Sequence, residues 1–129
     1  GYQADIGKGW WGSLYHEHGR KILAKNKLKE GEYLKPEQWN SYEILAVGHR
    51  IWLAINGKIT VAVRDPIGEL DGQISLQIHG GIPQKIIYRK LRLTRNPKVE
   101  ISGMKESELA TLLTLAPKGF VQPLNKSNK

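Results

Sequence analysis

Residues 14–20, with the sequence LYHEHGR, hold the densest group of side chains that could do chemistry. If the segment is a strand, His16 and His18 point to the same side, a spacing that suits chelation of a divalent metal, and Glu17 points away. Two imidazoles do not complete a metal site, and a His-x-His pair is more often surface decoration. Metal binding and an ordinary polar strand end therefore both stay open.

A second polar group lies further along the chain, at Gln77 and His79. These two side chains occupy alternate positions of a predicted strand and are followed by Gly80 and Gly81. Glycines have no side chain and so permit close approach of a ligand or another backbone. The structural alternative is a hydrogen bond from His79 to the following loop.

Imidazoles are the natural candidates for acid/base work in this chain. A neutral imidazole can accept a proton near pH 7 and later return it, which is what general acid/base catalysis requires. His49, directly before Arg50, adds a third position of this kind, as ambiguous as the others. The candidate acid/base histidines are His16, His49 and His79.

Composition limits the classes of function. The chain has 129 residues, which allows one domain and little more, and it has no cysteine, which excludes disulfides, thiolate nucleophiles and Cys-based metal sites. No apolar run approaches the roughly 20 residues that a bilayer span requires. No Gly-rich phosphate loop, G-x-S-x-G or HExxH motif is present, so nothing supports a nucleotide cofactor. The net charge of +8 suits an anionic partner but does not identify a reaction.

The elements that position these groups are predicted to be strands. Residues 50–55 and 58–63 flank Asn56-Gly57, a dipeptide that tolerates the two positive φ angles of a type I′ turn, and so form a hairpin. One face of this hairpin would be fully apolar, so another sheet must cover it. The residues predicted on that face are Ile51, Leu53, Ile55, Ile59, Val61 and Val63.

Period-two alternation predicts further strands at residues 39–47 (WNSYEILAV), 73–79 (QISLQIH) and 85–93 (KIIYRKLRL). Less regular strands are expected at residues 2–6 and 12–17. The region is therefore predicted to be an antiparallel sheet protein.

The remaining segments carry weaker signals. Five of the ten residues 20–29 are basic, which is typical of a solvated connection with a buried Ile22 or Leu23, although an anion-binding patch is also open. After residue 93 the pattern changes, and residues 106–115 predict one short helix before Pro117. We interpret residues 94–129 as a C-terminal extension.

The order of five motifs resembles the 3-keto-disaccharide hydrolase domain family, long catalogued as a domain of unknown function. The resemblance covers residues 1 to about 93, and Gln3 stands where many members carry Glu. The motifs are GYQADIG (residues 1–7), WWGSLYHEHGR (10–20), WNSYEILAVGHRIWLAINGK (39–58), SLQIHGG (75–81) and IYRKLRL (87–93).

The resemblance implies an all-β fold, a concanavalin-like antiparallel β-sandwich (jelly roll) that is incomplete in this chain and is followed by the short C-terminal helix. Residues 1–93 would be the C-terminal part of the domain, which in the family begins upstream of the segment that matches Gly1. An incomplete sandwich would expose the apolar hairpin face and free strand edges. We therefore expect an upstream fragment or a second chain to complete the sheet by strand pairing.

The resemblance also implies an exported, extracellular or periplasmic bacterial protein that cleaves 3-keto-glycosides by elimination and hydration. Such chemistry needs a base near C2, an acid near the glycosidic oxygen and donors around the C3 oxygen. The polar strand face would supply Glu17 or His79 as the base and His16 or His49 as the acid. The expected substrate-binding residues are Arg50, Gln77, Arg89, Trp39 and Asp5.

No organic cofactor is expected, and a divalent metal stays possible. The alternative function is a non-catalytic carbohydrate-binding or assembly module that keeps the sandwich without a complete site. Nucleic-acid binding is less favoured, because no recognition motif accompanies the scattered basic residues.

Overall fold

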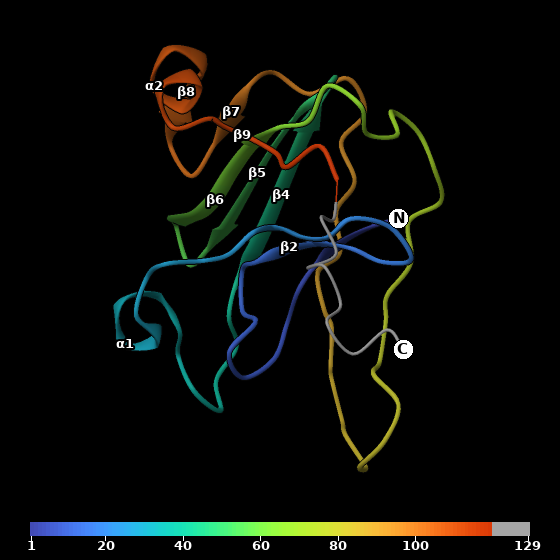
Figure 1. The fold of residues 1–129 in the computed structure, drawn as a ribbon. Helices are drawn as coiled ribbons and strands as arrows, with labels where there is room; N and C mark the ends of the chain where they lie inside the picture. The colour runs from blue at the N-terminus through green and yellow to red at the C-terminus, as the bar shows by residue number, and fades with distance from the viewer. Residues whose placement is uncertain (120–129) are drawn as a thin grey trace, which may run out of the picture.

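Two facing β-sheets form the body of the protein in a computed structural model, which describes residues 1–119 (Figure 1). The N-terminal sheet is antiparallel and consists of β1 (Tyr2–Ala4), β2 (Leu14–His16) and β3 (Lys21–Ala24), in that order. The main sheet consists of β4 (Tyr42–Val47), β5 (Arg50–Ile55), β6 (Lys58–Arg64) and β9 (Thr114–Leu115), in that order. The predicted all-β sandwich is confirmed.

The hairpin between β5 and β6 forms as predicted. Asn56 and Gly57 both have positive φ, 49° and 79°, as the type I′ turn requires. The Asn56 side chain also accepts a hydrogen bond from the Ser41 backbone N–H (2.9 Å) and donates one to the Tyr33 carbonyl (2.7 Å). The turn is thereby anchored to the short helix α1 (Glu30–Tyr33) and to the start of β4.

A first apolar cluster fills the space between the two sheets. Leu14 of β2 and Leu23 of β3 pack there against one face of the β5–β6 hairpin. The predicted covering of that face by another sheet is therefore confirmed, and the expectation that an incomplete sandwich leaves it exposed is wrong. The buried hairpin residues in this cluster are Ile51, Leu53, Val61 and Val63.

A β-bulge changes the predicted facing of one residue. Leu53 pairs with Val61 but the next residue, Ala54, pairs with Ile59, so that Thr60 is the extra residue of β6. The Thr60 hydroxyl donates to the Gly12 carbonyl at 2.6 Å. Because of this shift Ile59 packs on the opposite face of the main sheet, in the second cluster, so the prediction that it shares a face with Val61 is wrong.

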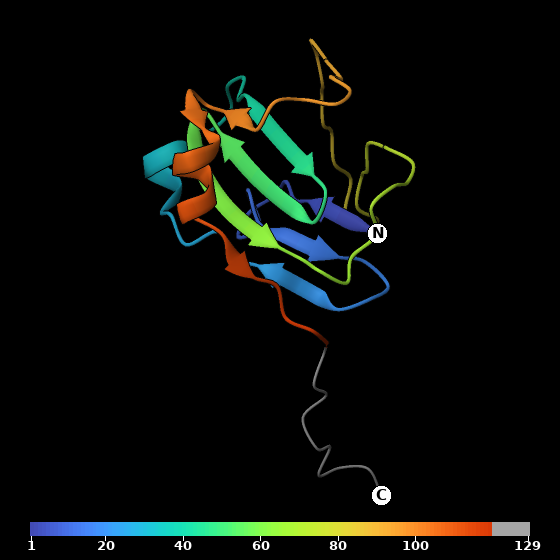
Figure 2. The same cartoon turned by 90° about the horizontal axis from the view of Figure 1, so that it is seen from above.

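The opposite face of the main sheet is covered by the segment after residue 98. This segment contains β7 (Glu100–Ile101), β8 (Met104–Lys105) and α2 (Glu106–Thr111). Trp52 is fully buried beneath it, packs in a second cluster with Ile101 and Leu109, and donates its indole N–H to the Leu109 carbonyl at 2.9 Å. Figure 2 shows the two sheets as layers with α2 at one side.

Two predicted strands do not form. Between Asp65 and Val99 the structure has no strand, and residues 73–79 and 85–93 run as extended chain on the side of the molecule away from α2 (Figures 1 and 2). Alternation makes a segment suitable for a sheet, but a strand also needs a neighbour to accept its backbone hydrogen bonds. The alternate apolar side chains are consequently exposed: Ile74, Leu76, Ile78, Ile87, Leu91 and Leu93.

Several predicted boundaries shift. The strand predicted from residue 39 begins at Tyr42, and residues 20–29 contain β3, with Leu23 buried and Ile22 exposed. The helix predicted for residues 106–115 ends at Thr111, because Thr114 and Leu115 extend to pair in parallel with β6. Of the predicted extension, residues 120–129 lie outside the described residues. No helix within residues 1–119 is long and apolar enough to cross a membrane.

The first cluster can be tested by two substitutions at cross-strand neighbours. Leu53 is fully buried, whereas Ile44, its partner on β4, is 61% exposed. Leu53→Ala should lower the free energy of unfolding by about 2–5 kcal/mol, because it leaves a cavity between the sheets. Ile44→Ala should change it by less than about 1 kcal/mol. Chemical denaturation measures both, and equal losses would contradict this packing.

Candidate functional site

Residues of β1 and β2 alternate between the core and the solvent. Tyr2, Ala4 and Leu14 pack into the first cluster, so the side chains between them face outward from the N-terminal sheet. Pairing continues one residue beyond each strand, because Asp5 N–H donates to Ser13 and Glu17 N–H donates to Gly1. We call this outward surface the outer polar face; its residues are Gln3, Asp5, Tyr15 and Glu17.

Asp5 is the most perturbed carboxyl group on the outer polar face. Its burial, with a smaller contribution from the charge of Glu17, raises the pKa of Asp5 to about 6. Its main chain is fixed at both ends, since its N–H donates to Ser13 O (3.0 Å) and its carbonyl accepts from Tyr42 Oη (3.2 Å). A positioned carboxyl group with a pKa near 6 can hold and release a proton close to neutral pH.

The extended chain brings one further predicted residue to this face. Gln3 Nε2 donates to Gln77 Oε1 at 2.7 Å, which joins residues 74 positions apart. His79 follows two residues later; it is exposed, and its Nδ1 donates to the neighbouring Gly80 carbonyl at 2.6 Å, the local hydrogen bond of the structural alternative. The structure thus brings together Asp5, Glu17 and Gln77 among the predicted site residues.

Trp10 borders the outer polar face. Its ring meets the edge of the Tyr15 ring at a centroid distance of 6.0 Å and an interplanar angle of 90°, and about two fifths of its side chain is exposed. An exposed indole beside hydrogen-bonding groups can pack against the C–H face of a sugar.

The two histidines flanking Glu17 do not point to the same side, as a continuous strand would have required for metal chelation. Strand β2 ends at His16, and His18 adopts a positive φ of 57° in the following turn. The side chain of His18 is 91% exposed and that of His16 only 12%. Among residues 1–119, no group of three His, Asp or Glu side chains is arranged to hold a metal ion.

His16 instead faces inward, toward a buried ion pair between Arg20 and Asp65. Arg20 Nη1 donates to Asp65 Oδ1 at 2.8 Å, and both Arg20 Nη2 and the Tyr2 hydroxyl donate to Asp65 Oδ2. The guanidinium lowers the pKa of Asp65, which is 1% exposed, while burial and the Asp65 contact raise the pKa of Tyr2 to about 12. These contacts fix the positions of Tyr2, Arg20 and Asp65 relative to one another.

Sequence reasoning missed Asp65. Its only signal was an acidic residue directly after an apolar strand, a position where a carboxylate is buried only if a cation pairs with it. Gly68 lies against the same group, and a side chain there would collide with the Tyr2 hydroxyl and with Asp65. The lack of a side chain at residue 68 thus allows the loop after β6 to close over the ion pair.

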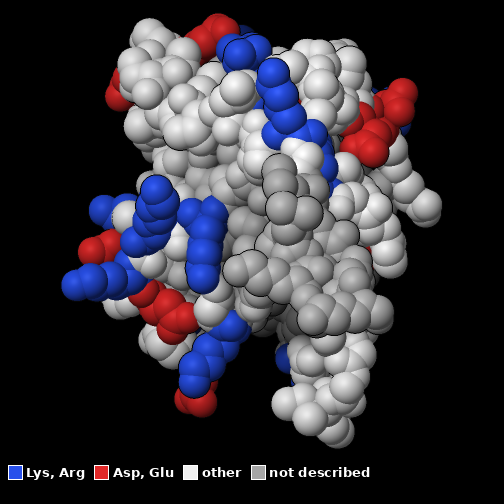
Figure 3. Space-filling view, in the orientation of Figure 1, with Lys and Arg blue, Asp and Glu red and all other residues white. Residues whose placement is uncertain are grey.

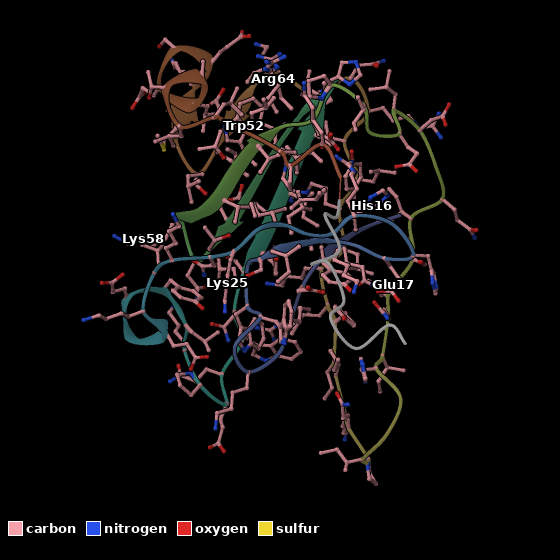
Figure 4. All side chains as sticks on the ribbon, in the orientation of Figure 1. His16, Glu17, Lys25, Trp52, Lys58 and Arg64 are labelled. Carbon is pink, nitrogen blue, oxygen red and sulfur yellow. The ribbon has the colours of Figure 1, made fainter. Side chains whose placement is uncertain are left out.

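Two predicted catalytic histidines lie at this ion pair. His16 Nδ1 accepts hydrogen bonds from the Arg20 backbone N–H (3.2 Å) and Nε (3.3 Å), while its Nε2 lies 3.5 Å from Glu69 Oε2. His49 Nδ1 donates to the Asp65 carbonyl at 3.1 Å. His16 is therefore on the opposite side of β2 from Glu17, although the two residues are adjacent in sequence (Figure 4).

The two predicted arginines lie in different places. Arg50 pairs with Glu106 at 3.0 Å and stacks on Trp52 at 5.4 Å, on the face of the main sheet that α2 covers. The structure therefore does not bring Arg50 to the outer polar face. Arg89 is exposed and lies 3.8 Å above the Trp39 ring.

Comparison with known protein families gives a match over most of the chain. The family model described as 3-keto-alpha-glucoside-1,2-lyase-like domain matches residues 1–94. The match includes the N-terminal sheet, the β4–β6 strands and the extended chain that carries Gln77. No curated protein matches this chain.

The ion pair can be tested by removing one partner. Arg20→Met leaves Asp65 buried without its cation, so the free energy of unfolding at pH 7 should fall by about 3–5 kcal/mol. Because the pKa of Asp65 is lowered in the folded state, the advantage of the unmodified protein should shrink as pH falls below about 4. Arg64→Met, at an exposed arginine, is the control and should cost about 0.5 kcal/mol or less. Similar losses for both variants would contradict the role of Arg20.

Proposed function

Because the chain belongs to the 3-keto-alpha-glucoside-1,2-lyase-like domain family, we propose that it cleaves glycosides whose sugar carries a ketone at C3. The family supports a carbohydrate-related, 3-keto-glycoside function. The observation that carries a catalytic role is the carboxyl pair on the outer polar face, in which Asp5 has a pKa of about 6 and senses the charge of Glu17.

The chemistry requires proton transfer at two positions of the sugar. A ketone at C3 acidifies the proton on C2, so a base can remove it while the C1–O bond breaks and the leaving oxygen takes a proton from an acid. Water then adds across the resulting C1–C2 double bond, with hydroxyl at C1 and a proton at C2. Negative charge develops on the C3 oxygen and needs hydrogen-bond donors.

The residues on the outer polar face match these needs. Glu17, with its side chain partly exposed, is proposed as the base, and Asp5 in its protonated form as the acid. Gln77 accepts from Gln3 through Oε1, which leaves its Nε2 to donate to the C3 oxygen. His79, on the same extended segment, is the alternative base. Proposing Asp5 as the acid moves this role from His16, which contacts Arg20, and from His49, which contacts the Asp65 backbone carbonyl.

A carbohydrate-binding module without catalysis is the second candidate. The observation that favours it is the exposure of two indoles, those of Trp10 and Trp39, which can pack against sugar rings. Turnover distinguishes the two functions, since a binding module has none to lose.

Substitution of the carboxyl groups tests catalysis. Asp5→Asn and Glu17→Gln should each lower kcat on a 3-keto-glucoside about 10²–10⁴-fold, with sugar affinity retained, as expected for lost acid/base catalysis. His79→Gln, measured alongside, decides whether His79 is the base. Because Asp5 must be protonated to act as the acid, kcat should fall as pH rises above about 6.

The matched control for these variants is Glu37→Gln, at an exposed carboxylate in the loop before β4. It should leave kcat unchanged. Full activity of both Asp5→Asn and Glu17→Gln would contradict the catalytic proposal, and absence of turnover with retained sugar binding would favour the binding module.

We also propose that a second polypeptide, or a further segment of the same one, pairs with the extended chain. Residues 73–79 and 85–93 carry exposed apolar side chains and no strand pairing, and both β1 and β4 have one unpaired edge within the described sheets. Exposed edges beside apolar side chains favour association with another strand.

Amide hydrogen exchange with native mass spectrometry tests this pairing. In the chain alone, the amides of residues 73–79 and 85–93 should exchange rapidly, while those of β5 stay protected as the internal control. With the partner bound, both segments should become protected. A well-folded isolated monomer with these segments already protected would contradict the proposal.

A further inference from the structure

The extended chain concentrates the positive charge of the protein. Residues 72–99 contain six lysines and arginines and no aspartate or glutamate, so these 28 residues supply +6 of the net charge of +8. None of the four ion pairs found among residues 1–119 involves a residue of this segment. The six cations are Lys85, Arg89, Lys90, Arg92, Arg95 and Lys98.

The lysines near α1 are arranged differently. Figure 3 shows basic side chains at the left of this view, where Figure 4 labels Lys25 and Lys58, with acidic side chains among them. Opposite charges at short range cancel part of the field that a distant anion feels. The 72–99 segment has no acidic residue of its own; Glu69 and Asp71 precede it and Glu100 follows it.

Arg89 is the best-positioned cation of this segment. Its guanidinium lies 3.8 Å above the ring of Trp39, which is 48% exposed. Within residues 1–119 the guanidinium makes no hydrogen bond or ion pair, so its N–H groups are available to a ligand. Stacking on the indole restricts the side chain beforehand and so reduces the entropy lost when an anion binds.

The same segment reaches the outer polar face, because Gln77 accepts the hydrogen bond from Gln3. A ligand at Asp5 and Glu17 therefore lies next to a part of the segment that carries the six cations. The two carboxyl groups would repel an anion placed directly on them, whereas an anionic group at a distance from the reacting carbons would be attracted by the cations of this segment.

We propose that the 72–99 segment selects glycosides that carry an anionic group, a carboxylate or a sulfate, and that Arg89 stacked on Trp39 is the residue that binds this group. The inference rests on the proposed function, since it assigns the substrate class of the same site. A planar guanidinium binds either group through two N–H donors, so carboxylate and sulfate share one recognition chemistry.

Calorimetric titration of the full chain with three uncleavable ligands tests the proposal: a neutral glucoside, the matching glucuronoside and the matching 6-sulfated glucoside. At low salt at least one anionic ligand should bind about tenfold or more tightly than the neutral one, as a charged bidentate contact predicts. The ligand that binds more tightly identifies the source of the anion. The preference should shrink at high salt.

Arg89→Gln should remove the preference, and Arg89→Lys, which keeps the charge without the planar fork, should keep only part of it. Arg64→Gln, at an exposed arginine outside this segment, is the matched control and should retain the preference. Equal affinity for all three ligands, an Arg89→Gln variant that still discriminates, or tighter binding of a polyglutamate peptide than of any sugar would overturn the proposal.

Together with the turnover measurements on 3-keto-glucosides, these titrations separate this inference from the proposed function. Turnover of 3-keto-glycosides without anion preference would overturn the inference alone. Anion preference without turnover would support the inference about recognition and overturn the catalytic proposal alone.

Discussion

The buried ion pair between Arg20 and Asp65 is the contact on which the arrangement of the two sheets depends. Arg20 precedes β3 of the N-terminal sheet, and Asp65 follows β6 of the main sheet, so one salt bridge ties the sheets at the same end. In a poorly solvated position either charge alone is strongly unfavourable, which makes separation of the sheets costly. Tyr2 supplies a third hydrogen bond and includes β1 in the same unit.

This fixed inner side determines what the outer side can do. Because side chains on a strand alternate, holding Tyr2 and His16 at the ion pair directs Gln3 and Glu17 outward. His16 and Glu17 are thus adjacent in sequence but lie in different environments. His16 packs against the ion pair, and Glu17 faces a surface that is open to a ligand. The positions of Glu17 and Asp5 on the outer polar face follow from packing that involves neither of them.

The sequence predicts the features that depend on residues close together in the chain. It does not predict the features that depend on contacts between residues far apart in the chain. Asn56-Gly57 predicts its hairpin because the turn chemistry is local, and the alternation in β2 identifies Glu17. No sequence pattern around Thr60 predicts the bulge, because the position of Thr60 depends on a hydrogen bond to Gly12, 48 residues away. Residues 73–79 alternate as a strand does, yet alternation says nothing of whether a neighbouring strand is present. Asp65 was missed because its partner, Arg20, lies 45 residues away.

The segment that covers Trp52 determines where a stable fragment of this protein can end. The family match ends at residue 94, but Ile101 and Leu109, beyond that limit, both pack against Trp52, and the Leu109 carbonyl accepts the hydrogen bond of its indole. A recombinant fragment that ends where the family match ends would lack the segment that covers Trp52. It would expose an apolar surface that favours aggregation. The smallest piece that retains both apolar clusters extends to Ala116, well past the region that the family model matches.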